Sequence, residues 1–200
     1  MSETEKRMAG TYEIINSVHI GSKEIVIGVD KDNTENGKYY CGNCERCEIL
    51  ELFTDGVTSD SYPAIVGEFA RRISAEAKDI MNIINEEKAI VGDDRQLTID
   101  DCSYPVSSED NIINKVVIID GDIMRPEYQR ASHQLVLVTG GNGAYANARG
   151  RKVFTKNLLN GQDNTFCRQD VVGIVDVEML PKWAKDGYDK YAINLDRGAR

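Results

Sequence analysis

Residues 59–87 have the sequence SDSYPAIVGEFARRISAEAKDIMNIINEE, and this stretch decides how the N-terminal half of the chain folds. Asp60 and Ser61 are good N-cap residues, and Pro63 suits the first turn of a helix. Apolar side chains then recur every three or four residues, at Ile65, Phe69, Ile73, Ala77, Ile80 and Ile84. This spacing places them on one face of a helix. We therefore expect a helix over residues 63–86 that packs this face across a sheet.

The residues before this helix predict that sheet. Short runs rich in β-branched residues alternate with turn signals such as Gly21-Ser22, Asp30 to Gly37 and Asp55-Gly56. This pattern is typical of antiparallel strands joined by hairpins. The expected strands are residues 12–20, 24–29, 38–41 and 48–53. With the helix they form an acidic α+β domain over residues 11–90.

The C-terminal half has a different pattern. Residues 91–111 are polar and acidic, so we expect a linker there. Four β-rich runs follow, at residues 115–119, 134–139, 151–157 and 165–175, and Asn160-Gly161 is a strong hairpin signal. We expect a small β-barrel over residues 112–186, then a tail over 187–200. Pro181 opens a short terminal helix whose Trp183 is expected to close one end of the barrel. The predicted fold class is α+β.

Composition excludes several classes of protein. The chain has 200 residues, of which 41% are hydrophobic and 28% charged, which is typical of a soluble globular protein and not of a disordered one. No run approaches the roughly 18 apolar residues that a membrane helix needs. Residues 1–10 are polar and mixed in charge, without the features of a secretory or transit peptide. We expect a cytoplasmic protein that makes no contact with a membrane.

The net charge of −9 is unevenly distributed. Residues 1–100 contain 11 Lys and Arg against 20 Asp and Glu, whereas residues 101–200 contain 13 of each. An acidic surface repels phosphate and attracts basic protein surfaces, so direct nucleic-acid binding by the N-terminal half is not expected. Alternation along residues 48–53 is expected to place Glu45, Glu48 and Glu51 near one another beside the cysteine turn, with Asp55 and Asp60 following in the loop. These five carboxylates are the predicted partner-binding group. The alternative is an acidic strand edge that only maintains solubility and prevents strand pairing.

The five cysteines do not indicate a disulfide framework, because their number is odd and no secretory signal precedes them. Cys41-Gly42-Asn43-Cys44 has the spacing of a zinc knuckle, which predicts that the Cys41 and Cys44 sulfurs lie within about 4 Å of each other at a tight turn. Zinc usually takes four ligands, and the chain has no second pair with this spacing. No cofactor is therefore expected, and zinc held by Cys41, Cys44 and Cys47 is the alternative.

A glycine-rich stretch, Thr139 to Ala146, resembles the phosphate-binding turn of a dinucleotide-binding protein. That turn must open a helix, whereas here a β-rich run follows, so a wide loop between strands is expected. The loop and its flank contain the most basic group of the chain, and a glycine-rich loop beside cations can hold a phosphate or carboxylate. The residues of this possible anion site are Gly140, Gly141, Gly143, Arg149, Arg151 and Lys152. His19 and His133 lie in no known catalytic motif.

Seven stretches together resemble one group of proteins. They are residues 24–28 (EIVIG), 38–41 (KYYC), 59–62 (SDSY), 124–128 (MRPEY), 134–143 (QLVLVTGGNG), 150–154 (GRKVF) and 180–184 (LPKWA). The chain resembles, over residues 12–186, uncharacterised accessory proteins carried by conjugative elements and phages of Gram-positive gut bacteria. The resemblance implies a mobile genetic element as the source and counter-defence as the setting, in the class that includes anti-restriction and anti-CRISPR proteins. It implies no reaction.

Two hypotheses about function follow. The first is a non-catalytic protein-binding protein of a mobile element that inhibits a host defence nuclease, such as a CRISPR effector, by placing its acidic surface in a basic nucleic-acid channel. The second is a small metal-binding module or enzyme that uses the Cys41/Cys44/Cys47 turn or the Gly140–Lys152 loop. Metal analysis of the purified protein and capture of a host nuclease distinguish the two.

Overall fold

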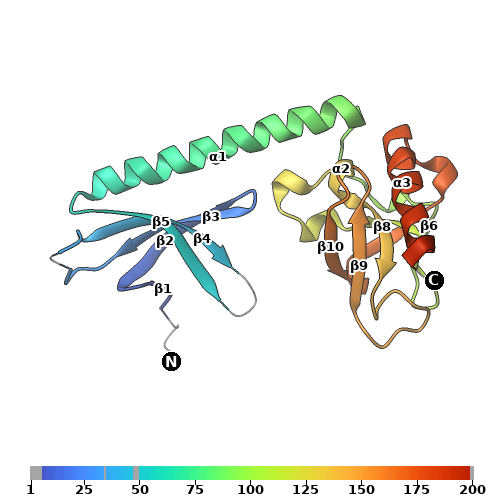
Figure 1. The fold of residues 1–200 in the computed structure, drawn as a ribbon, viewed down its shortest axis with the longest axis horizontal. Coiled ribbons are helices and arrows are strands. Elements are labelled where there is room, and N and C mark those ends of the chain that lie inside the picture. Colours follow the sequence, from blue (N-terminus) through green and yellow to red (C-terminus); the bar gives the residue numbers. More distant parts are fainter. Residues whose placement is uncertain (1–5, 34, 47–49, 199–200) are drawn as a thin grey trace. The chain divides into compact units, whose positions relative to one another are not determined.

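The chain forms two compact units, Met1–Ile83 and Ile84–Arg200. They are seen in a computed structural model that describes residues 6–33, 35–46 and 50–198 (Figure 1). The boundary between the units falls inside the long helix α1 (Tyr62–Val91), not in residues 91–111, where the linker was expected. Each unit has its own antiparallel sheet, so the predicted α+β fold class is confirmed.

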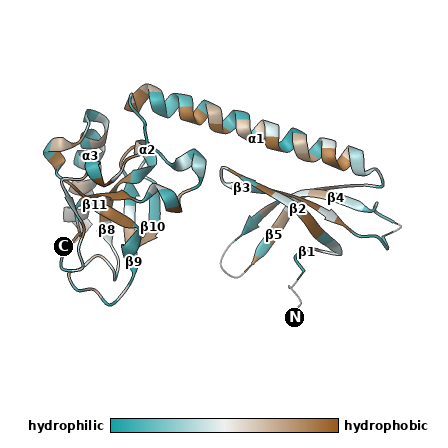
Figure 2. Ribbon diagram, turned by 180° about the vertical axis from the view of Figure 1, so that it is seen from behind, coloured by the Kyte–Doolittle hydropathy of each residue, from teal (hydrophilic) through white to brown (hydrophobic). Residues whose placement is uncertain are grey.

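Unit 1 is a five-stranded antiparallel sheet with α1 along one face (Figure 1). Hydrophobic and hydrophilic residues alternate along the helix (Figure 2), and Ile65 and Phe69 are buried against Ile25, Ile27 and Cys41 of the sheet. The expected helix and the first hairpin are therefore present. The strands, in their order across the sheet, are β1 (Met8–Ala9), β2 (Tyr12–Ile20), β3 (Lys23–Val29), β4 (Tyr39–Arg46) and β5 (Glu51–Ser59).

Strands β4 and β5 are longer than predicted. The signal at Asp55-Gly56 was expected to end a strand, but β5 continues through it to Ser59. Asp55 has a positive φ of 53°, and the pairing shifts there from Asn43 opposite Thr54 to Cys41 opposite Val57. These are the features of a β-bulge, in which the turn-type residue bends the strand without ending it.

Unit 2 contains a barrel-like, six-stranded sheet in the order β10-β9-β8-β7-β11-β6. All of its strand pairs are antiparallel. The expected strand over residues 165–175 is two strands, because a short 3-10 helix, Arg168–Asp170, separates them and the second pairs with β7 instead. The strands are β6 (Tyr104–Pro105), β7 (Val116–Ile119), β8 (Leu135–Gly140), β9 (Lys152–Asn157), β10 (Asp163–Cys167) and β11 (Val171–Val175).

The sheet of unit 2 has a hydrophobic cluster on each face. In β7, Val117 and Ile119 belong to one cluster, while Val116 and Ile118 belong to the other with Leu180 and Ala184. Burial on both faces explains why β7 is an uninterrupted apolar run. Two short helices complete the unit, α2 (Ala131–Gln134) and α3 (Lys182–Gly198). Trp183 at the start of α3 packs against the second cluster.

Two segments predicted to lie outside the folded domains belong to unit 2. Residues 91–111 include the 3-10 helix Ile99–Asp101 and the edge strand β6, which pairs with β11. The side chain of Gln134 bonds both the N–H and the carbonyl of Leu97, so this stretch is fastened to the sheet and is not a linker. Residues 187–198, expected as a tail, continue α3. Among the described helices, none has the length and apolar character needed to cross a bilayer.

Candidate functional site

The carboxylates predicted to bind a partner do not form one group. In the pairing of β4 with β5, Glu45 is opposite Leu52 and Arg46 is opposite Glu51. Residues directly opposite each other share a face, so Glu45 and Glu51 lie on different faces of the sheet. Asp55 is at the bulge and accepts a bond from the Asn43 side chain, at 3.0 Å. Asp60 accepts a bond from the backbone N–H of Lys38, and Glu48 lies outside the described residues.

Glu51 takes part in an ion network centred on Arg7. The Arg7 guanidinium donates two hydrogen bonds to Glu24, at 2.5 and 2.6 Å, and one to Glu51, at 2.7 Å. Glu24 is only 2% exposed. The hydrogen bonds from Arg7 outweigh the effect of burial and hold the pKa of Glu24 at about 2. This network stabilises unit 1, so Glu51 is not a free surface carboxylate.

The predicted cysteine turn is a strand. Cys41 and Cys44 lie inside β4, three residues apart, and alternation along a strand puts them on opposite faces. Accordingly, Cys41 packs beneath α1, while Cys44 packs with Tyr12 and Tyr40 on the other face. Burial raises the pKa of both thiols, which disfavours the thiolate form that binds metal. Cys47 lies outside the described residues, and no group of three or more possible metal ligands occurs within them.

The glycine-rich loop has the expected strand-to-strand form. Gly141 has a φ of +105°, and a Cβ there would lie 2.3 Å from the carbonyl oxygen of Lys152. The N–H of Gly143 donates to that same oxygen, and the Asn142 side chain accepts a bond from the Lys152 N–H. Arg168 donates to the carbonyls of Gly143, Ser107 and Asp110. The loop is therefore held by hydrogen bonds to its own last residue, Lys152, which begins β9.

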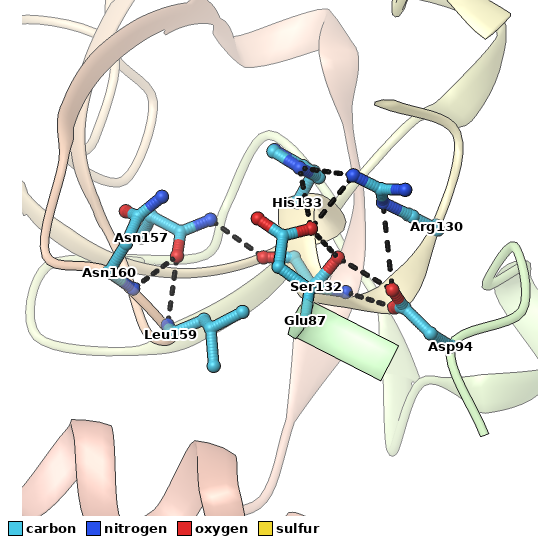
Figure 3. Close-up of polar contacts among 8 residues, drawn as sticks. All are labelled: Glu87, Asp94, Arg130, Ser132, His133, Asn157, Leu159 and Asn160. Atoms are coloured by element: carbon cyan, nitrogen blue, oxygen red, sulfur yellow. Dashed lines mark hydrogen bonds and ion pairs between the residues drawn. The ribbon is translucent and has the colours of Figure 1, made fainter. Parts of the chain in front are cut away.

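A polar network that the sequence analysis did not find lies in unit 2 (Figure 3). Arg130 donates to Glu87 at 2.7 Å, and the Ser132 hydroxyl donates to Asp94 at 2.9 Å. His133 Nε2 is 3.3 Å from Glu87, and Asn157 donates to the Ser132 carbonyl at 2.8 Å. These residues are distant in sequence, so no local motif marks them. The network ties the last turns of α1 to α2 and β9.

This network combines serine, histidine and carboxylates, but it is not arranged for catalysis. Ser132 is 1% exposed, and within the described part of the chain no hydrogen bond joins it to His133. A serine nucleophile needs both access to substrate and an adjacent base. Burial raises the pKa of Glu87, but the contacts with His133, Arg130 and Ser132 together lower it below its usual value. A charged Glu87 suits a structural role as partner of Arg130.

The face of the unit 1 sheet opposite α1 carries an aromatic hollow. The rings of Tyr12 and Tyr40 stack with their centroids 5.3 Å apart. They line a hollow of about 500 Å³ together with Phe53, Asn33 and other residues, none of which carries a formal charge. The Tyr40 ring lies across Gly42, where a Cβ would be 2.0 Å from the Tyr40 hydroxyl. We call this feature the tyrosine hollow.

Carboxylates without a cationic partner lie near the tyrosine hollow. Burial raises the pKa of Tyr12, and the negative charges of Asp30 and Asp60 raise it further. In the described chain Asp30, Asp32, Glu35 and Asp60 form no ion pair, whereas Glu24, Glu51, Glu68 and Glu76 do. Asp32 and Glu35 are next in sequence to Asn33 and Asn36, which line the hollow, and this segment also contains Lys31 and Lys38, so it has more carboxylates than ammonium groups. The region is net negative, and we call these four carboxylates the acidic rim.

Comparisons with protein families, curated proteins and solved structures found no match to the chain. Function therefore has to be inferred from the surfaces themselves.

Proposed function

We propose that the protein is a non-catalytic binding protein, and that the tyrosine hollow with its acidic rim takes a basic segment of a partner protein. The observation that carries the proposal is the concentration of unpaired carboxylates beside an uncharged aromatic hollow. Elsewhere in unit 1 the described carboxylates are mostly used in ion pairs of the fold. Carboxylates left without an ion-pair partner at one end of a sheet create a local negative field.

The chemistry of the hollow suits a Lys- or Arg-rich segment. The faces of Tyr12, Tyr40 and Phe53 are π surfaces over which a cation and its aliphatic stem can pack. The Asn33 and Asn36 side chains offer hydrogen-bond acceptors and donors. The acidic rim would steer such a segment toward the hollow and accelerate association. No residue in this lining is a nucleophile with an adjacent base, which favours binding over catalysis.

We propose further that the partner is a host defence nuclease, as the resemblance to mobile-element accessory proteins implies. A nuclease has a basic channel for its nucleic acid, and an acidic surface is complementary to such a channel. The part of the earlier hypothesis that is retained is the acidic, protein-binding character of the N-terminal half, including Asp60. The surface now proposed differs from the strand edge with Glu45 and Glu51.

The test uses the full chain as bait in a lysate of its bacterial host, followed by purification of any captured nuclease and kinetic binding at low salt. Asp30→Asn, Asp32→Asn and Asp60→Asn are combined in one variant, because Asn keeps the oxygen acceptors that Asp30 and Asp60 use in the fold. We expect association to slow about tenfold or more when these charges are removed. Thr58→Arg, which places a bulky cation at the hollow, should abolish binding.

The matched control removes three other exposed charges with Glu45→Gln, Asp55→Asn and Asp79→Asn. Its association rate should be that of the wild type. If the control variant slows association and the acidic-rim variant does not, the binding surface includes one or more of Glu45, Asp55 and Asp79, and the proposed one is wrong. If neither variant changes association, acidic recognition itself is refuted.

A further inference from the structure

Strand β9 exposes an aromatic ring on the outer face of unit 2. Along β9 the residues alternate, so that Val153, Thr155 and Asn157 are buried while Lys152, Phe154 and Lys156 share the other face. Phe154 is 47% exposed and packs beside Gly140 of the neighbouring strand. A half-exposed phenyl ring between two lysines is not explained by the packing of the unit.

Polar groups surround this ring. On β10, Thr165 is directly opposite Phe154, and Asp163 is opposite Lys156. A hollow of about 470 Å³ beside the ring is lined by Thr139, Phe154, Thr155, Asp163, Asn164 and Thr165. Hydroxyl, amide and carboxylate groups can bond the donor and acceptor atoms at a nucleobase edge or on a ribose, while the phenyl face accepts a stacked base.

The same region is the most cationic part of the chain. Residues 131–169 contain five Lys and Arg and a single acidic residue, Asp163, which pairs with Lys156 at 2.6 Å. The side chains of Arg149, Arg151 and Lys152 are exposed, and they form no ion pair or hydrogen bond with any residue that the structure describes. The N–H of Asn147 in this loop donates to the carbonyl of Ser108, so two carboxylates that follow Ser108 lie near the loop. They are Glu109, which is exposed, and Asp110, which accepts hydrogen bonds from Ser107. The cations outnumber these carboxylates.

The backbone that carries these cations is held in a defined conformation. Gly141 and Gly143 pack against the backbone of residues 151 and 152, where side chains would clash. Gly150 packs against Asn142, whose side chain bonds the Lys152 N–H. The backbone of Arg149 and Arg151, which precede Lys152 in the chain, is therefore already ordered before a ligand binds. Binding then costs little backbone conformational entropy.

We propose that Phe154 and Lys152 of this strand face, together with Arg149 and Arg151 of the loop that precedes it, bind single-stranded nucleic acid. A stacked base requires an unpaired nucleotide, and the cations match the phosphates on either side of it. A free phosphate would account for the cations but not for the exposed ring. An apolar protein surface would account for the ring but not for three unpaired cations. The proposal concerns unit 2 only and does not depend on the protein-binding role of unit 1.

The test is the fluorescence anisotropy of fluorescein-labelled U15 RNA and dT15 DNA with the full chain at about 0.05 M salt. Phe154→Ala should weaken binding about 5- to 150-fold, the range for loss of one stacked base. Phe154→Trp should restore it, because stacking needs an aromatic face. In the single change Lys152→Gln, the plot of log affinity against log salt should become shallower, its negative slope decreasing in magnitude by about 0.7.

Two control variants test the specificity of the result. Tyr104→Ala removes a ring that is 40% exposed on β6, and Lys88→Gln with Lys182→Gln removes two exposed cations elsewhere in unit 2; both should bind like the wild type. Removal of the acidic rim of unit 1 should not reduce oligonucleotide affinity. The proposal is refuted if neither oligonucleotide binds, if a duplex of the same length binds as tightly, or if Phe154→Ala binds unchanged. Tighter binding of U15 than of dT15 would support a contact to the 2′-hydroxyl.

Discussion

Replacing Arg7 with Met should destabilise unit 1 strongly, although Arg7 is near the N-terminus and partly exposed. The change removes the two hydrogen bonds from Arg7, which are the largest cause that holds Glu24 in its charged form. The pKa of Glu24 is lowered from 4.5 to about 2. Because each factor of ten in an acid dissociation constant is worth about 1.4 kcal/mol, the network contributes about 3 kcal/mol. This agrees with the range of about 3–5 kcal/mol for removing one partner of a buried ion pair.

The sign of the pH dependence follows from the direction of the pKa change. A carboxylate whose pKa is lowered in the folded state stabilises that state fully above its unfolded pKa, and this contribution is lost as pH falls. The free energy of unfolding of unit 1 should therefore decrease between about pH 4.5 and 2, through the pKa of Glu24. The Arg7→Met variant should lack this part of the decrease. Glu68, whose pKa is also about 2, titrates in both proteins and cancels in the comparison.

Cys41 is a suitable reporter of opening. It is 0% exposed beneath α1, on the opposite face from Arg7, so removing the Arg7 side chain does not itself uncover it. Labelling of Cys41 with a thiol reagent, resolved by peptide mass spectrometry, should be about a hundredfold faster in Arg7→Met at pH 7. Amide hydrogen exchange of residues 25–27 extends the measurement to acidic pH.

The double change Arg7→Met with Glu24→Gln separates lost contacts from an uncompensated charge. Because Gln is neutral, the double variant should recover much of the stability that Arg7→Met loses. Labelling of Cys41 within threefold of the wild-type rate in Arg7→Met would refute the reasoning. So would a double variant that is no more stable than the single one.

Two further predictions concern unit 2. Arg130→Met leaves Glu87 and Asp94 without the arginine that pairs with them, and we expect the free energy of unfolding to fall by about 3–5 kcal/mol. Urea unfolding followed through the fluorescence of Trp183, the only tryptophan of the chain, measures this loss. A loss below about 1 kcal/mol would show that the network is not structural. Gly141→Ala forces a side chain into a positive φ and against the Lys152 carbonyl, and should cost about 1–3 kcal/mol in the same assay, while Gly67→Ala, at an open site on α1, should not destabilise the protein.

The sequence predicted those parts of the fold that depend on local pattern. The spacing of Ile65, Phe69 and Ile80 predicts the buried face of α1, and alternation predicts which β9 residues are buried. The prediction that a loop and not a helix follows Gly143 was also correct, because the next residues return to a strand. In each case the residues that carry the signal also make the contacts.

Pairing between distant residues overrode local signals elsewhere. Asp55-Gly56 is a turn signal, but pairing with β4 on both sides makes it a bulge. Cys41-Gly42-Asn43-Cys44 has turn chemistry, but β3 and β5 bond it on both edges as a strand. The last turns of α1 belong to unit 2, where Glu87 pairs with Arg130, 43 residues later, and no local pattern contains this contact. The pairing register of β4 with β5 also places Glu45 and Glu51 on different faces of the sheet.

Net charge alone does not decide whether this chain binds nucleic acid. At about 0.15 M salt the screening length is about 8 Å, so a ligand on the β9 face responds to the charges of that face and little to more distant ones. The total of −9 then matters less than the charges around that face, where the five cations of residues 131–169 outnumber Asp163 and the neighbouring Glu109 and Asp110. At about 0.01 M salt the screening length is about 30 Å, and the acidic residues of the whole chain oppose the phosphates. Repulsion at low salt therefore weakens the gain in affinity that counterion release would otherwise give. At physiological salt a ligand on either surface responds mainly to the charges of that surface, so the acidic and the basic surface can bind different partners.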